Sequence, residues 1–185
     1  MYRSVEQEFQ QELSASERLL WSGKPQTGIV FRGSDVFLAP FSIMWCGFAI
    51  YWEFSVVTSN APFFFMLWGI PFVLVGLYMV FGRFYLDSMQ RKKTFYGLTN
   101  ERIIIISGLF GRKVKNLNLK TLSEVVLKEK SNRSGTISFG AGNPMYSMFG
   151  GTGWPGTGQH LPPSFEMIPN VKDVYNMVRN AQKEA

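Results

Sequence analysis

The stretch VFLAPFSIMWCGFAIYWEFSVV at residues 36–57 decides the architecture of this chain of 185 residues. It holds 22 residues and one charged side chain, Glu53. A second stretch, PFFFMLWGIPFVLVGLYMVF at residues 62–81, holds 20 residues and no formal charge. An apolar helix needs roughly 20 residues to cross the hydrocarbon core of a bilayer. We therefore predict two transmembrane helices rather than a helical pair buried in a soluble core.

Only residues 58–61 connect the two predicted spans, so the helices must be antiparallel neighbours. The connection carries no Lys or Arg, whereas basic residues flank both outer ends of the hairpin. Under the positive-inside rule, this predicts a multi-pass protein of the inner (cytoplasmic) membrane with both termini in the cytoplasm. Glu53 then lies near the outer interface, where a simple interfacial role is favoured over that of a functional intramembrane carboxylate.

Charge is unevenly spread along the chain. Residues 82–185 hold 15 Lys and Arg against 7 Asp and Glu, whereas residues 1–81 hold 4 against 6. A basic domain beside a bilayer attracts anionic headgroups. We therefore expect membrane lipids as partners, and no nucleic acid, which is the competing anionic ligand.

Side chains that perform catalysis or bind metals are scarce. Cys46 is the single cysteine and His160 the single histidine, so neither a disulfide nor a thiolate or imidazole metal cluster is expected. The glycine pattern GTGWPG at residues 151–156 is rejected as a dinucleotide fingerprint, because Pro155 lies where a helix would have to open. We expect no catalytic residue, no metal, no cofactor and no enzymatic activity.

The first 35 residues are polar and carry short helical signals. Apolar spacing in residues 4–13 predicts a weak amphipathic helix. Ser14 and Glu17 form a capping box that predicts a second short helix, ended by the glycine and proline within residues 23–25. Two interpretations stay open: a frayed tail, or an interfacial helix with Trp21 at headgroup depth.

From residue 94 the pattern changes to short alternating stretches separated by turn residues, which favours an antiparallel sandwich or barrel. The β-branched run Ile103–Ile106 is typical of a strand buried on both faces. Asn170 is expected to cap a final helix with one apolar stripe. Strands are predicted at residues 94–98, 103–106, 113–119, 125–127, 135–139 and 164–168.

Residues 141–163 are rich in Gly and Pro. We favour a further strand at Met145–Phe149 and a mobile loop at Gly150–Gly158. The alternative is that the apolar side chains of this segment enter the membrane interface. The candidates for that contact are Met148, Phe149 and Trp154.

Five stretches resemble bacterial pleckstrin-homology-like (PH-like) domains: YGLTNERIIIISG at 96–108, Leu117–Leu119 followed by Leu122–Leu127, GTISFG at 135–140, FEMIPNVKDVYNMV at 165–178 and, more loosely, LSASERLLWSGKP at 13–25. The resemblance implies two antiparallel sheets, usually of seven strands, closed at one end by a C-terminal helix. With six strands visible by pattern, the seventh is expected near Met145–Phe149.

The expected fold is a membrane α-helical hairpin plus a mainly β domain, a PH-like antiparallel β-sandwich or barrel capped by a C-terminal helix. We expect three parts. They are a cytoplasmic segment at 1–35, the transmembrane hairpin at 36–84 with spans 36–57 and 62–81, and a cytoplasmic PH-like domain at 85–185.

Two functions are considered. The first is a membrane-anchored binding or scaffolding module whose basic residues contact anionic lipid headgroups, against the plainer interpretation of a solvated basic face. The second is a protein–protein module or an oligomer-forming subunit of a membrane assembly. The basic residues considered for the lipid contact are Lys92, Lys93, Arg102, Arg112, Lys113 and Lys115.

Overall fold

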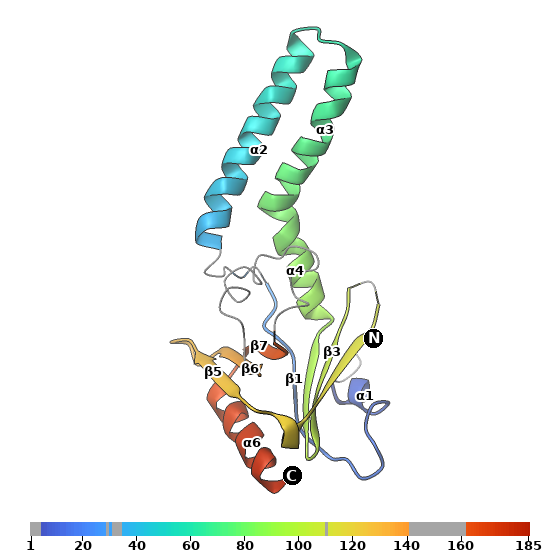
Figure 1. Cartoon of the computed structure of the whole chain (residues 1–185), viewed down its shortest axis with the longest axis vertical. Helices are drawn as coiled ribbons and strands as arrows, with labels where there is room; N and C mark the ends of the chain where they lie inside the picture. The colour runs from blue at the N-terminus through green and yellow to red at the C-terminus, as the bar shows by residue number, and fades with distance from the viewer. Residues whose placement is uncertain (1–4, 29, 31–34, 110, 141–161) are drawn as a thin grey trace. The chain divides into compact units, whose positions relative to one another are not determined.

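The computed structural model describes residues 5–28, 30, 35–109, 111–140 and 162–185 (Figure 1). The chain divides into two compact units. One unit, the hairpin, comprises the described residues 30 and 35–87. The other, the β domain, comprises the described residues 5–28, 88–140 and 162–185. The segment before the hairpin thus belongs to the same unit as the strands after it.

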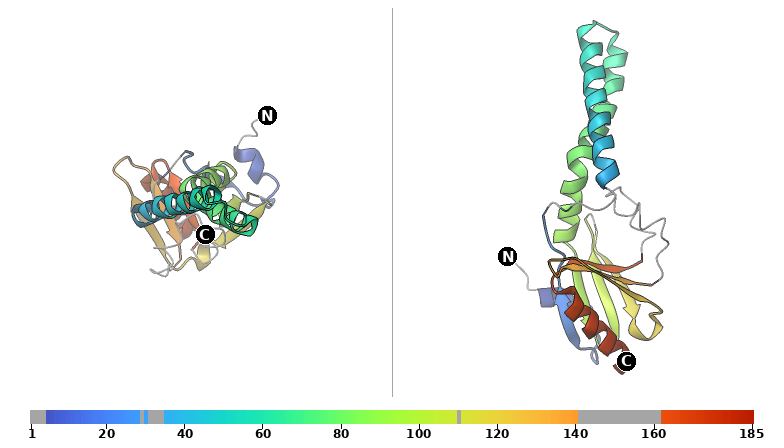
Figure 2. Two further views of the ribbon diagram at one scale, coloured as in Figure 1. Left: turned by 90° about the horizontal axis from the view of Figure 1, so that it is seen from above. Right: turned by 90° about the vertical axis from the view of Figure 1, so that its left-hand side faces the viewer.

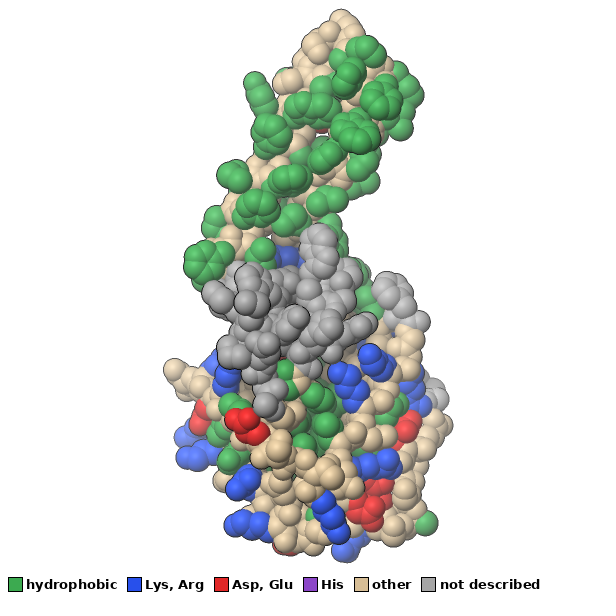
Figure 3. Space-filling model, viewed as in Figure 1, with side chains coloured by type: hydrophobic (Ala, Val, Ile, Leu, Met, Phe, Trp, Pro, Cys, Tyr) green, Lys and Arg blue, Asp and Glu red, His purple; other side chains and the backbone are tan. Residues whose placement is uncertain are grey.

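The hairpin consists of α2 (Asp35–Thr58) and α3 (Phe63–Leu77), which run side by side (Figures 1 and 2). The second helix continues through a π-helical turn, η1 (Tyr78–Gly82), into α4 (Arg83–Lys92). Large apolar side chains cover the hairpin surface (Figure 3), and Phe37 is 73% exposed. Both helices are long and apolar enough to cross a membrane. The predicted helical hairpin is confirmed, and its two apolar helices are candidates for membrane association by length and composition.

Small side chains form the seam between α2 and α3. Cys46 and Ala49 are buried on α2, and Gly69 and Gly76 on α3. A Cβ on Gly76 would lie 2.9 Å from the Cα of Cys46, so only glycine permits this approach of the backbones. The two glycines are seven residues apart, a spacing that keeps them on one helix face.

A buried ion pair closes the open end of the hairpin. Nη1 of Arg83 lies 3.0 Å from Oδ1 of Asp35, and each side chain is only 7% exposed. Asp35 stands in the first turn of α2, where the helix dipole favours a carboxylate. The guanidinium of Arg83 also lies 4.5 Å from the ring centroid of Phe84. This pair therefore joins the first turn of α2 to the first turn of α4.

Within its described residues, the β domain holds two antiparallel sheets, which do not close into a barrel. The first has the order β1 (Leu19–Gly23), β2 (Phe95–Thr99), β3 (Arg102–Ser107), β4 (Lys113–Asn118). A short 3₁₀ turn, η2 (Leu119–Thr121), follows β4. The second sheet has the order β5 (Val125–Glu129), β6 (Gly135–Phe139), β7 (Ser164–Ile168). The final helix is α6 (Val171–Glu184).

The six strands predicted after residue 94 are confirmed, and so are the two sheets with a C-terminal helix. The described residues contain a seventh strand, but it is β1, formed by residues that precede the hairpin. The strand expected at Met145–Phe149 lies outside the described residues. Asn170 precedes α6 as predicted, but it adopts a left-handed conformation with φ of 47°. Its side chain makes no capping bond, so the predicted side-chain cap was wrong.

One apolar core lies between the sheets and α6. The ring of Phe165 packs at its centre, 4.8 Å from the ring centroid of Tyr96 and 4.9 Å from that of Phe139. Val174 and Val178 of α6 are buried against this cluster. The apolar stripe predicted for α6 is confirmed, and burial of these aromatic and branched side chains supplies the main stabilisation of the domain.

A second, smaller core covers the opposite face of the first sheet. α1 (Val5–Phe9) places Phe9, fully buried, against Ile104 and Ile106. A Cβ on Gly97 would lie 2.7 Å from Cε1 of Phe9, so glycine makes room for that ring. The predicted burial of Ile103–Ile106 on both faces is confirmed, and α1 is what covers the outer face.

Two expectations for the N-terminal segment are corrected. The helix expected after Ser14 is instead strand β1, although Glu17 does accept a hydrogen bond from the backbone N–H of Ser14 as in a capping box. Pairing with β2 overrides that local signal. The indole of Trp21 belongs to the β domain core, with its ring centroid 5.5 Å from that of Phe165, and does not form part of an interfacial helix.

Candidate functional site

The hairpin is inserted between two adjacent strands of one sheet. β1 pairs with β2 in antiparallel register, with Leu19 opposite Thr99 and Gly23 opposite Tyr96. The chain therefore leaves the sheet at β1, forms the hairpin, and returns to the neighbouring position at β2. This arrangement brings the segments that enter and leave the hairpin next to each other.

Arg91 joins those two segments. Its side chain is buried, and its guanidinium donates to the carbonyl oxygens of Gln26, at 2.8 Å, and Gly28, at 2.6 Å. Gln26 in turn donates from its backbone N–H to the carbonyl of Met167, the residue before the last of β7. Arg91 thus holds the segment that leads into the hairpin against the last turn of α4.

One of the basic residues expected at the lipid surface, Arg102, is engaged in a partly buried network. Its Nε and Nη2 donate to the two carboxylate oxygens of Glu17, both at 2.8 Å. Thr99 donates a further bond to Glu17 at 2.7 Å. Burial by itself raises the pKa of Glu17, but hydrogen bonds from Arg102 and Thr99 outweigh it and leave that pKa below its ordinary value.

The same contact raises the pKa of Arg102, chiefly through its hydrogen bonds to Glu17. Arg102 also donates to the backbone carbonyl of Glu12 at 2.7 Å. Its guanidinium therefore fixes the N-terminal segment to β3, and we leave it out of the lipid surface proposed below.

Arg112, the residue before β4, also contacts the N-terminal segment. Its guanidinium lies 3.0 Å from Oε1 of Glu12 and donates to the side-chain oxygen of Gln11 and to the backbone carbonyl of Glu8. The Arg112 side chain is 42% exposed, so this pair stabilises the fold by less than about 1 kcal/mol. Arg112 therefore has a carboxylate partner in Glu12.

The remaining expected lysines are less constrained. Lys92, Lys93 and Lys113 are exposed and Lys115 is half-buried. The ammonium of Lys93 donates to the carbonyl oxygen of Leu109 at 3.3 Å, which ties the connection between β3 and β4 to the end of α4. Within the described ranges, no carboxylate forms an ion pair with these four lysines.

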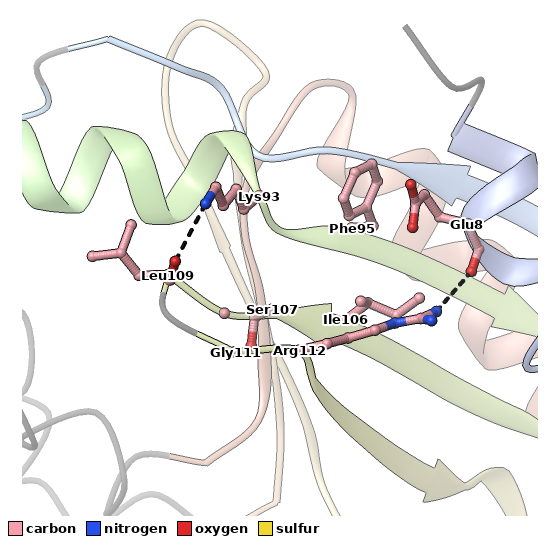
Figure 4. Close-up of a pocket in the computed structure, with 9 residues that line it drawn as sticks. Glu8, Lys93, Phe95, Ile106, Ser107, Leu109, Gly111 and Arg112 are labelled. Atoms are coloured by element: carbon pink, nitrogen blue, oxygen red, sulfur yellow. Dashed lines mark hydrogen bonds between the residues drawn. The ribbon is translucent and has the colours of Figure 1, made fainter. Parts of the chain in front are cut away.

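A pocket of about 350 Å³ opens between α1, the end of α4 and the connection from β3 to β4 (Figure 4). Phe95 and Ile106 supply an apolar floor, and Lys93 and Arg112 lie at its margins. Gly108 is required there, because its φ of +154° and its close approach to the carbonyl of Gly111 exclude a Cβ. The residues that line the pocket are Glu8, Lys93, Phe95, Ile106, Ser107, Gly108, Leu109, Gly111 and Arg112.

The ammonium of Lys24, just after β1, lies 4.5 Å from the centroid of the Phe95 ring. Cations from three chain segments thus meet around Phe95: Lys24, Lys93 and Arg112. Lys93 and Arg112 were predicted from charge, but their association with α1 was not, since Glu8 and Arg112 are more than 100 residues apart. The only local signal was the apolar spacing that predicted a helix in residues 4–13.

Three expected interface residues, Met148, Phe149 and Trp154, lie outside the part of the chain that the structure describes, as does His160. Among the residues that are described, no group of three or more His, Cys, Asp or Glu side chains is arranged to hold a metal ion. The described residues do present exposed lysines and a small pocket.

A family model described as "Bacterial PH domain" matches residues 38–182, well over half of the chain. The match begins within α2, so α1 and β1 precede it. No curated protein and no solved structure matches the chain.

Proposed function

We propose that this chain, which belongs to the bacterial PH domain family, is a membrane-anchored module whose β domain contacts anionic lipid headgroups at the cytoplasmic face. The family consists generally of binding or scaffolding modules rather than catalysts. The two apolar helices supply the anchor. The exposed lysines near the end of α4 supply the charge.

The pairing of β1 with β2 supports the topology. Two strands that share hydrogen bonds lie on the same side of any membrane that the hairpin between them crosses. Lys and Arg residues flank the hairpin on both sides, and the connection at residues 58–61 has none, which favours the cytoplasm for the whole β domain.

The observation that carries the lipid contact is the hydrogen bond from Lys93 to Leu109. Lys93 follows the last residue of the apolar stretch, Phe81, by twelve positions, and the intervening chain is helical. At a rise of 1.5 Å per residue, Lys93 lies within about 18 Å of the end of that stretch along the chain. The connection from β3 to β4, and Lys113 just after it, are held to the same point.

Each basic residue near an anionic surface contributes about 1 kcal/mol of attraction. Lys92, Lys93, Lys113 and Lys115 form no ion pair with a described carboxylate, so their charge is available to lipid. Together we call these four residues the lysine surface. Their attraction to the bilayer weakens with salt, because the Debye length falls from about 10 Å at 0.1 M to about 3 Å at 1 M.

The test uses the full chain in nanodiscs, with Cys46→Ser removing the native thiol and Gly111→Cys carrying a spin label. A Cβ at Gly111 meets no atom within 4 Å, so the position tolerates the label. A second label at Lys120→Cys, in η2 beyond the other end of β4, is the control. Relaxation by headgroup-attached paramagnetic lipid is measured in neutral and in anionic discs.

We expect stronger relaxation at Gly111→Cys in anionic discs than in neutral discs, with the difference declining at high salt. Changing the four residues of the lysine surface to Gln removes most of the difference, whereas Lys120→Cys shows little in either disc. Equal relaxation in neutral and anionic discs contradicts the lipid contact. If the labelled chains then self-associate in nanodiscs large enough to hold several copies, the assembly function replaces the lipid contact.

A further inference from the structure

The pocket between α1 and the end of α4 carries two opposite charges that the fold leaves unpaired. The ammonium of Lys93 has three donors, and one of them is used by the carbonyl of Leu109. The carboxylate of Glu8 makes no hydrogen bond or ion pair with the described residues, and it lies beside the Phe95 ring (Figure 4). The backbone carbonyl of Glu8 accepts a hydrogen bond from Arg112.

The third charged residue of the pocket, Arg112, already has a partner of opposite charge. Arg112 lies 3.0 Å from a carboxylate oxygen of Glu12, which does not line the pocket. The lining therefore presents one unpaired cation and one unpaired anion above the apolar floor of Phe95 and Ile106. A volume of about 350 Å³ accommodates a small polar molecule.

The chemistry of the two charges selects the ligand. A simple anion at Lys93 would meet the like charge of Glu8, which disfavours it. A ligand that carries a phosphate at one end and a primary ammonium at the other satisfies both groups. A quaternary ammonium has no N–H to donate to Glu8, so it forms a weaker contact.

We propose that this pocket binds the headgroup of a zwitterionic phospholipid, with the phosphate on Lys93 and a primary ammonium on Glu8. The inference rests on the proposed contact with lipid headgroups and specifies one headgroup class within it. The lysine surface then responds to the net charge of the bilayer, whereas the pocket selects one lipid by the form of its headgroup.

The test uses the full chain in an uncharged maltoside detergent, labelled with ¹⁵N at its 18 glycines. Gly108 and Gly111 line the pocket, and Gly135 of β6 does not, so their amide signals separate binding in the pocket from general effects. The chain is titrated with glycerophosphoethanolamine, glycerophosphocholine and inorganic phosphate.

We expect glycerophosphoethanolamine to shift the Gly108 and Gly111 signals to saturation and to leave Gly135 unchanged. The other two probes bind at least about fivefold more weakly. Glu8→Gln weakens glycerophosphoethanolamine about fivefold but does not weaken phosphate, and Lys93→Gln weakens both probes. The matched controls Glu6→Gln and Lys92→Gln, exposed neighbours that do not line the pocket, change neither affinity.

Equal affinity for the three probes, or an unchanged affinity in Glu8→Gln, overturns the choice of headgroup. An absence of any shift at Gly108 and Gly111 overturns the pocket itself. Either result leaves the lysine surface standing if the nanodisc labels still respond to anionic lipid. Loss of that response as well shows that the broader lipid function is wrong.

Discussion

Glu17 and Arg102 join the chain before the hairpin to the chain after it, with Oε2 of Glu17 lying 2.8 Å from Nη2 of Arg102. The Glu17 carboxylate is 1% exposed and the Arg102 side chain 26% exposed. Because 85 positions separate the two residues, their contact exists only when β1 has docked beside β2 and β3. The pair thus reports on the assembly of the whole β domain.

The first prediction concerns this pair. Glu17→Gln is expected to lower the free energy of unfolding of the β domain by about 2 kcal/mol, because two charge-assisted bonds to Arg102 are weakened in a buried setting. Glu12→Gln, which weakens the exposed pair with Arg112, is expected to cost less than about 1 kcal/mol. Chemical unfolding of the full chain in detergent measures both. Equal effects of the two variants would contradict the buried role of Glu17.

The pair also predicts a pH dependence. The pKa of Glu17 is lower in the folded chain than its ordinary value of 4.5, so the unfolded chain binds the proton more readily. The stability that Glu17 contributes is therefore complete above pH 4.5 and is lost as the pH falls through the lower pKa of the folded state. Between pH 7 and pH 3, the free energy of unfolding is expected to fall less for Glu17→Gln than for the native chain. Chemical unfolding at each pH measures it.

The second prediction concerns the insertion of the hairpin. A chain that joins residue 28 to residue 88 through a short Gly-Ser linker should fold without the hairpin, because Arg91 holds the Gly28 carbonyl at 2.6 Å. Residues 88–185 alone lack α1 and β1 and should remain poorly ordered, since Ile104 and Ile106 lose their cover. Dispersion of amide signals in solution distinguishes the two. A well-folded 88–185 fragment would show that the N-terminal segment is dispensable.

The third prediction tests the second core by a double-mutant cycle. Phe9→Ala leaves a cavity against Ile104 and Ile106 and is expected to cost about 3–5 kcal/mol. Gly97→Ala alone is destabilising, because its Cβ would lie 2.7 Å from the Phe9 ring. The double variant should cost less than the sum of the two, since the new methyl group occupies space that the ring has left. If the two losses of unfolding free energy simply add in the double variant, Phe9 does not contact Gly97.

The fourth prediction concerns the seam of the hairpin. Gly76→Val forces α3 away from Cys46 and is expected to lower the thermal stability of the chain in detergent. Gly47→Ala is the matched control, because a Cβ at Gly47 meets no atom within 4 Å and alanine favours the helix. A neutral Gly76→Val would show that the helices do not meet at this glycine.

Local patterns predicted most of the elements. The two apolar stretches indicate helices by length alone, and the strands after residue 94 follow from alternation and turn residues. Strand β1 was missed because Ser14 and Glu17 form a genuine local capping contact, whereas the pairing of β1 with Phe95–Thr99 spans the entire hairpin. Single-sequence signals do not report contacts of that separation.

The candidate site was predicted in part for the same reason. Lys93 and Arg112 were identified by charge, but nothing near them in the sequence indicates that Glu8 lies opposite. Arg102 was expected at the lipid surface because of its charge. Its pairing with Glu17 could not be predicted, because Glu17 lies far away in the sequence. Charge alone identified the basic residues, and only the fold separates those that stabilise the domain from those that face outward.

The central claim is that a membrane hairpin interrupts one cytoplasmic β domain, and cysteine accessibility in intact cells tests it most directly. In the Cys46→Ser background, single substitutions are made at Glu6 and Lys183, in the two described terminal segments, and at Ser59, between the two spans. We expect a membrane-impermeant maleimide to label Ser59→Cys from outside, and to label Glu6→Cys and Lys183→Cys only after the cells are opened. Labelling of Glu6→Cys and Lys183→Cys from opposite sides of the membrane would contradict the shared sheet and with it the account.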